Sequence, residues 1–297
     1  MAHTPAAKTQ ASHLGRKALA FLAVLFLGLG ACNASPAAGP SSSAGASPAS
    51  ASAGSIATER LVVAFGDSFA DPGGWPAVLA DMLAKESGGS ARVGGFSCPG
   101  GCGGSEVQRL TTLAGTVRDL ASADLIVVQP QPGFNVLPVW RSYAGGACGR
   151  SDGRDCIRRS IQTYRAYVNE LLDTIMQLSP ADAAIRVILA NAHGVRMWNG
   201  TGMDYTYDLE AADPELFDVF VEQYRGIMNQ AAEAAAERCI PVFDANSLFV
   251  GADYRGKYPH RYTRDGAHPS AEANRLIAEH LMALGSDPRI PGCEAIS

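Results

Sequence analysis

The chain has 297 residues, of which 47% are hydrophobic and 18% are charged, and its formal net charge is −5 at pH 7. This slight acidic excess, with no cluster of lysine and arginine, argues against a nucleic-acid-binding protein. The composition is that of a soluble globular protein, although not every part of the chain has the residues needed to fold.

Residues 1–31 have the pattern of an export signal. Three basic residues precede an uninterrupted apolar run over 18–30, which is shorter than the ~20 residues that a helix needs to span a bilayer. The run ends in Leu-Gly-Ala-Cys, which resembles a bacterial lipobox. The resemblance implies that Cys32 becomes the lipid-carrying first residue of an exported protein anchored in the cell envelope. The alternative is a plain secretory signal and a secreted protein.

Residues 32–57 consist mainly of Ala, Ser, Pro and Gly and carry no charge. Such a segment cannot bury enough apolar surface to offset the entropy lost on ordering, so we expect a flexible tether. The folded domain is therefore expected over 58–297, a length that one α/β domain can accommodate.

Strand-like and helix-like stretches alternate from residue 61 onward. The apolar runs predict strands over Leu61–Phe65, Ala91–Gly94, Leu125–Gln129, Ile185–Ala190 and Ile240–Phe243. Helical periodicity predicts helices over Trp75–Lys85, from Ser105 onward, Ile157–Leu178, Pro214–Arg238 and Ser270–Leu284, the last capped by Ser270. The alternation predicts an α/β fold, a flavodoxin-like, doubly wound sheet of about five parallel strands with helices on both faces. The loops 94–104 and 145–156 are rich in glycine, and each contains two cysteines.

There are seven cysteines, an odd number for an exported protein. Assigning Cys32 to lipid leaves six, for which sequence alone allows 15 pairings. No histidine lies at zinc-ligand spacing from these cysteines, so disulfides are favoured over a metal site. Short loop closure favours two local pairs and leaves one long-range pair: Cys98–Cys102, Cys148–Cys156 and Cys239–Cys293.

Two distant segments supply the residue types of nucleophilic acyl transfer. Gly-Asp-Ser68 follows the first predicted strand, and Asp265-Gly-Ala-His268 precedes the last predicted helix. A serine hydroxyl is a weak nucleophile until a base takes its proton, and His268 is the candidate base. Asp265, one turn earlier, is placed to accept the other imidazole N–H and to fix the tautomer. We therefore predict a catalytic Ser68, His268 and Asp265.

Four blocks in this order resemble those of the SGNH (GDSL) hydrolase family, in particular its secreted bacterial esterases and lipases. They are the Gly-Asp-Ser68 block, the glycine-rich stretch 98–105, Gly-Phe-Asn135 and the Asp265–His268 block, and the resemblance covers the whole mature domain. It implies an oxyanion hole formed by the N–H of Ser68, a glycine N–H from the second block and the Asn135 side chain. Val136 stands where the family usually has Asp.

The glycine donor is not fixed by the sequence. Gly104 is favoured because a helix is expected from Ser105 onward, while Gly101 and Gly103 remain alternatives within the stretch Gly100–Gly104. The segment 149–153 matches the G-x-S-x-G pattern of α/β-hydrolases formally, with Ser151 at its centre. No buried strand leads directly into it, so Ser151 is disfavoured as a nucleophile. His193, which ends a predicted strand, is either structural or lines the pocket.

The resemblance implies a carboxylic ester hydrolase that acts through an acyl-enzyme on Ser68 without metal or cofactor. Its expected partners are a small ester or acylated substrate and, through the lipid, a membrane; no nucleic acid is expected, and the protein is expected to be a monomer. The alternatives are an O-acetyl esterase or acyltransferase acting on envelope or plant polysaccharide, or a catalytically silent envelope-binding module. The acyl length and the alcohol part stay open.

Overall fold

The structure is a computed structural model, which describes residues 59–98, 106–131, 133–149, 152–190, 192–285 and 293. All of them lie in one compact unit, Ser55–Ser297. The predicted export signal, Cys32 and the tether lie outside the described residues. No helix within the described ranges is long and apolar enough to span a membrane.

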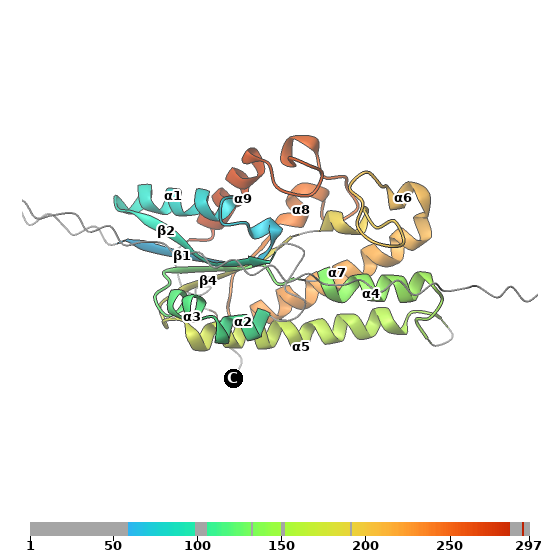
Figure 1. Ribbon diagram of the computed structural model, residues 1–297, viewed down its shortest axis with the longest axis horizontal. Helices are drawn as coiled ribbons and strands as arrows, with labels where there is room; N and C mark the ends of the chain where they lie inside the picture. The colour runs from blue at the N-terminus through green and yellow to red at the C-terminus, as the bar shows by residue number, and fades with distance from the viewer. Residues whose placement is uncertain are drawn as a thin grey trace, which may run out of the picture. The chain divides into compact units, whose positions relative to one another are not determined.

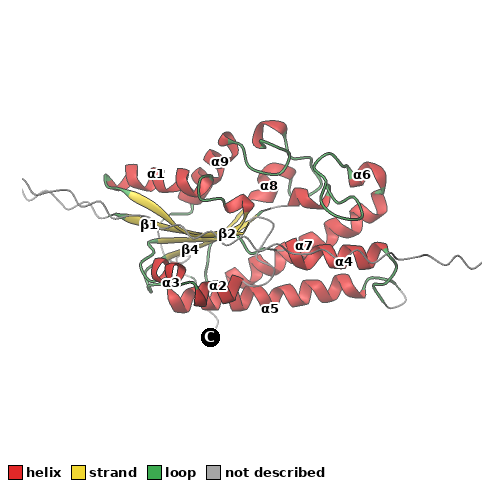
Figure 2. Ribbon diagram, in the orientation of Figure 1, coloured by secondary structure: helices red, strands yellow, loops and turns green. Residues whose placement is uncertain are grey.

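Five parallel strands form one sheet in the order β2-β1-β3-β4-β5. Their bounds are β1 Arg60–Asp67, β2 Ala91–Cys98, β3 Leu125–Val128, β4 Ala184–Leu189 and β5 Val242–Asp244. Consecutive residues of β1 and β3, such as Val62, Val63, Ile126 and Val127, are fully buried, because helices cover both faces of the sheet. The predicted doubly wound sheet is confirmed (Figure 2).

The helices form a layer on each side of the sheet (Figure 1). On one side α1 packs against α9, and on the other α5 packs against α7, α4 and α2. Their bounds, with those of the remaining short helices, are α1 Trp75–Ser87, α2 Glu106–Thr112, α3 Ala114–Leu120, α4 Gly133–Ala144, α5 Asp155–Leu178, α6 Leu209–Ala212, α7 Pro214–Ala236, α8 Ala245–Val250, α9 Ala271–Ala283, η1 Ser68–Ala70, η2 Ala192–Val195 and η3 His260–Tyr262.

The predicted elements are present, and most of their ends agree to within two residues. The second strand is an exception. We expected it to end at Gly94 and a loop to follow, but β2 continues to Cys98. Gly95, at φ +94°, pairs with Ala64 of β1, and a Cβ there would overlap the Ala64 carbonyl oxygen. The glycines that suggested a loop instead allow two strands to approach closely.

The third block also differs from expectation. Gly133–Asn135 is not part of any predicted helix, but it forms the first turn of α4. Val136 and Trp140, four residues apart, are both buried, and the Trp140 ring stacks on Phe220 of α7 at 4.6 Å. This apolar stripe gives the segment a helical face to bury and explains why it is not a loop.

Candidate active site

Ser68 directly follows β1 at the carboxyl edge of the sheet. The chain leaves β1 toward β2 on one side, whereas β3 lies on the other, so the end of β1 is the topological switch point of the sheet. Ligand sites of open α/β sheets lie at this position. Asp67 caps the turn that carries Ser68, because its Oδ1 accepts a hydrogen bond from the Phe69 N–H at 2.8 Å.

The turn at Ser68 is held from both sides. A Cβ at Gly66 would lie within 3 Å of the Gln129 side chain and of Ala70, so only glycine fits between them. The indole Nε1 of Trp75, at the start of α1, donates to the Phe69 carbonyl oxygen at 2.9 Å. Trp75 is fully buried, so it braces the nucleophile turn as part of the core.

The loop that carries Asp265 and His268 closes just before α9. Its ends are joined by a bridge between Thr263 and Pro269, and the Arg264 N–H donates to the His268 carbonyl oxygen at 3.0 Å. Gly266 sits at the tip with φ +95°, a conformation that favours glycine.

The structure brings the three predicted residues together. The His268 Nε2 atom lies 3.0 Å from the Ser68 hydroxyl oxygen, and its Nδ1 atom lies 2.6 Å from Asp265 Oδ2. The other carboxylate oxygen, Oδ1, accepts hydrogen bonds from the N–H groups of Ala267 at 3.0 Å and His268 at 2.8 Å. The Asp265 carboxylate is therefore fixed in the orientation that holds the imidazole toward Ser68.

The same contacts determine the charge of Asp265. Partial burial alone would raise its pKa, but the backbone hydrogen bonds from His268 and Ala267 outweigh burial and lower the pKa of Asp265 to about 2. The carboxylate is consequently ionised at neutral pH. An anion beside Nδ1 stabilises the imidazolium that forms when His268 takes a proton.

The predicted oxyanion donors are only partly described. Asn135 lies in the first turn of α4, but its side chain and Gly104 lie outside the described residues, as do Gly100, Gly101 and Gly103. Their roles stay predictions. A hydrogen bond from α5 holds the segment before Asn135, because the buried Tyr164 hydroxyl donates to the Pro130 carbonyl oxygen at 3.1 Å.

The alternative residues gain no support. Ser151 lies outside the described residues, and the segment before it follows α4 rather than a strand, so the strand–turn–helix setting of a nucleophile elbow is not present. His193 lies in η2, and its side chain is not described. Trp140 and Trp198 are buried against one another and Phe220, as core residues.

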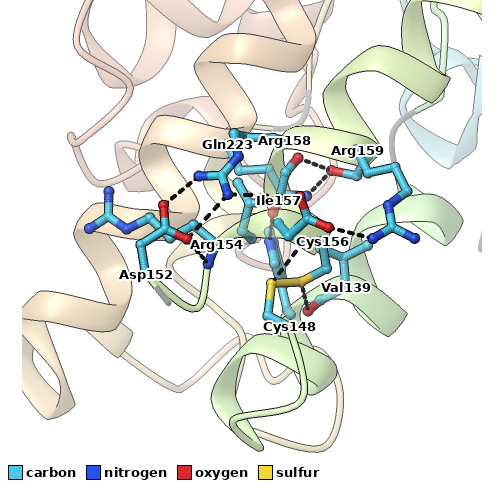
Figure 3. The surroundings of a disulfide bond; sticks show 12 residues. Val139, Cys148, Asp152, Arg154, Cys156, Ile157, Arg158, Arg159 and Gln223 are labelled. Carbon is cyan, nitrogen blue, oxygen red and sulfur yellow. Dashed lines mark hydrogen bonds and ion pairs between the residues drawn. A yellow bond between two sulfur atoms is a disulfide. The ribbon is translucent and has the colours of Figure 1, made fainter. Parts of the chain in front are cut away.

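Two of the three predicted disulfides are present. Cys148 is bonded to Cys156 and Cys239 to Cys293. Figure 3 shows the first, which closes the loop before α5 beside the ion pair of Arg158 with Asp152 at 2.6 Å. Cys102 lies outside the described residues, so the pair Cys98–Cys102 stays a prediction. Among the residues that the structure describes, no group of three His, Cys, Asp or Glu side chains is placed to hold a metal ion.

Two solved structures are similar to this chain in their overall fold. A lipase from a goat rumen metagenome matches with a TM-score of 0.55 at 14% identity, over 77% of this chain and 98% of that one. An extracellular lipase from Streptomyces rimosus matches with a TM-score of 0.50 at 18% identity, over 77% and 99%. The chain has the SGNH (GDSL) hydrolase fold. No family model and no curated protein matches its sequence. At such identities the likeness establishes the SGNH fold, and the chemistry rests on the residues of the site.

Sequence reasoning missed two buried polar residues beside the site. Gln129 accepts a hydrogen bond from the Asp67 N–H at 3.3 Å, and Glu106, the first residue of α2, is only 5% exposed. The signal for Glu106 was its spacing: it lies four residues before the buried Leu110, on the apolar face of the helix. For Gln129 the signal was a polar residue that directly continues a buried strand.

Proposed function

We propose that this protein is a serine ester hydrolase that cleaves carboxylic esters through an acyl-enzyme on Ser68. The observation that supports this most is the continuous line of hydrogen bonds from Asp265 through His268 to Ser68 at the switch point of the sheet. Two distant segments meet there with a nucleophile, a base and an orienting anion in the order that acyl transfer requires.

The reaction proceeds in two halves. In the first, the Ser68 oxygen adds to the ester carbonyl carbon while His268 Nε2 takes the hydroxyl proton, and the resulting imidazolium is stabilised by Asp265. The tetrahedral intermediate collapses, the alcohol leaves with the proton from His268, and the acyl group stays on Ser68. In the second half, water attacks the acyl carbon and gives one proton to His268. The second tetrahedral intermediate then collapses, the bond between the acyl carbon and the Ser68 oxygen breaks, the acid leaves, and His268 returns the proton to the Ser68 oxygen.

The negative charge on the carbonyl oxygen requires hydrogen-bond donors. The N–H of Ser68, the N–H of Gly104 and the side-chain amide of Asn135 are the proposed set, with the first at the end of β1 and the last at the start of α4. Fixed donors of this kind stabilise the transition state more than the substrate.

Turnover of short p-nitrophenyl esters tests the proposal. The Ser68→Ala variant should lose turnover while keeping its thermal unfolding temperature, whereas Ser122→Ala, which alters an exposed serine after α3, should behave like the unaltered protein. A fluorophosphonate should label Ser68, as located by mass mapping. Full turnover in Ser68→Ala, or a label on Ser151, would contradict the assignment.

The N-terminal pattern supports a second part of the proposal, that Cys32 carries lipid and that the tether holds the hydrolase at the cell envelope. Expressed in a bacterium, the unaltered protein should partition into detergent with the membrane fraction, and Cys32→Ser should appear in the aqueous fraction. Equal partitioning of the two would favour the plain secretory signal instead.

A further inference from the structure

A buried carboxyl group lies at the start of α2. Glu106 is 5% exposed, and its Oε2 atom accepts a hydrogen bond from the hydroxyl of Tyr167 on α5, 61 positions away. Burial of a carboxyl group is costly unless it is neutral or well partnered. In sequence, Glu106 stands two positions after Gly104, the favoured second oxyanion donor.

A second tyrosine stands beside the first on α5. Tyr164, one turn earlier, is 1% exposed, and its hydroxyl donates to the Pro130 carbonyl oxygen at 3.1 Å. The two tyrosine rings are 5.7 Å apart. Pro130 follows β3 and stands five positions before Asn135, the third candidate donor. Neighbouring hydroxyls of one helix therefore hold the segment after Gly104 and the segment before Asn135.

Charged and titratable groups from three elements surround Glu106. Burial, reinforced by the Asp67 carboxylate at the end of β1 and opposed by Arg109 of α2, raises the pKa of Glu106 to about 8. Tyr167 and Tyr164 face it from α5, and burial raises the pKa of the Tyr164 hydroxyl well above its usual value. Glu106 is therefore a neutral acid at pH 7, and its ionisation at higher pH places a second negative charge near Asp67, the residue before the nucleophile.

We propose that Glu106 is a positioning residue of the active site: with Tyr167 and Tyr164, it fixes on α5 the start of α2 and the segment at Pro130, the described parts of the chain that adjoin the predicted second and third oxyanion donors. The inference rests on the proposed function. A donor must lie within a few tenths of an ångström of the developing oxyanion, so loosening of this anchor lowers the rate of the chemical step and leaves substrate binding nearly unaltered.

Two variants test the role through kcat. Tyr167→Phe removes the hydroxyl that donates a hydrogen bond to Glu106. It should lower kcat roughly 10- to 100-fold with little change in KM. Its matched control is Tyr143→Phe, which alters a half-buried tyrosine of α4.

In the unaltered protein, kcat should fall roughly tenfold or more between pH 7 and 9.5 as Glu106 ionises. Glu106→Gln, whose amide has the same shape and no charge, should lose most of that decline, and the exposed control Glu170→Gln should retain it.

Stability against pH gives a readout that does not depend on activity. The folded-state pKa of Glu106 lies above its usual value of 4.5, so the folded protein binds a proton that the unfolded chain has released between pH 4.5 and about 8. The free energy of unfolding therefore falls as pH rises through this window and levels off above it. Glu106→Gln should show a shallower fall than the unaltered protein.

The outcomes separate the two proposals. If the unaltered protein cleaves no ester, the proposed function and the positioning role are both wrong. If the unaltered protein cleaves esters, the positioning role alone is wrong in either of two cases. Tyr167→Phe would retain full kcat, or Glu106→Gln would keep the decline of kcat at alkaline pH that the unaltered protein shows. An identical fall of stability with pH in Glu106→Gln also overturns it, because Glu106 would then not be the buried neutral acid.

Discussion

The His268 ring nitrogen Nε2 lies 3.0 Å from the Ser68 hydroxyl oxygen, across 200 positions of sequence. Two helices create this proximity. Ser68 stands shortly before α1, His268 stands shortly before α9, and the two helices pack against each other. At their starts a Cβ on Gly74 would lie 3.2 Å from the Asn274 side chain. The packing of α1 on α9 thus sets the distance between nucleophile and base.

Replacement of Asp265 by Asn should lower kcat roughly 10³- to 10⁴-fold with little change in KM, because a neutral amide cannot stabilise the imidazolium. The amide oxygen still accepts the N–H groups of Ala267 and His268, so the loop should keep its shape. Asp253→Asn is the matched control, since this exposed carboxylate also caps a backbone N–H, that of Arg255. A kcat within tenfold of normal would remove Asp265 from the mechanism.

Truncation of Asn135 to Ala should lower kcat roughly 10²- to 10³-fold, the usual loss for one oxyanion donor, with a modest effect on KM. Steady-state kinetics on a short ester gives both constants. If kcat is unaltered, the oxyanion donor must be sought elsewhere, and the departure from the family pattern at Val136 would extend to its neighbour.

Gly95→Ala should destabilise the protein far more than Gly88→Ala. Both residues have positive φ, which costs about 1–2 kcal/mol for a residue with a Cβ. At Gly88 nothing lies within 4 Å of the added atom, whereas at Gly95 it overlaps the Ala64 backbone and adds about 1–3 kcal/mol. Chemical denaturation measures the free energy of unfolding of each variant. Equal losses of stability in the two variants would show that β2 does not approach β1 this closely.

The two described disulfides should differ in their effect on stability. The chain-entropy model gives about 4 kcal/mol for Cys239–Cys293, with a sequence separation of 54, and about 2.5 kcal/mol for Cys148–Cys156, with a separation of 8. Chemical denaturation of Cys293→Ser and Cys156→Ser measures the two losses of stability, and the loss should be larger for Cys293→Ser.

Peptide mapping of the unreduced protein decides the Cys98–Cys102 pair, and a free thiol at Cys98 would refute it.

Elements that depend on a local residue pattern can be predicted from the sequence alone. Apolar runs mark β1, β3 and β4 because these inner strands are buried on both faces, and Ser270 marks the start of α9 because its hydroxyl caps the Ala273 N–H. The sequence also identified Ser68, His268 and Asp265, because their residue types and order are specific to one chemistry, and the structure brings all three together.

Features that depend on residues far apart in the sequence are set by the folded arrangement of the chain. The full length of β2 depends on how closely Gly95 approaches Ala64, and the helix that begins at Gly133 depends on an apolar partner supplied by α7. The protonation of Glu106 is the clearest case. Its pKa is set by burial and by Asp67, and its hydroxyl partner comes from another helix. A carboxyl group acquires such properties from the medium that surrounds it, and that medium forms only when the chain has folded.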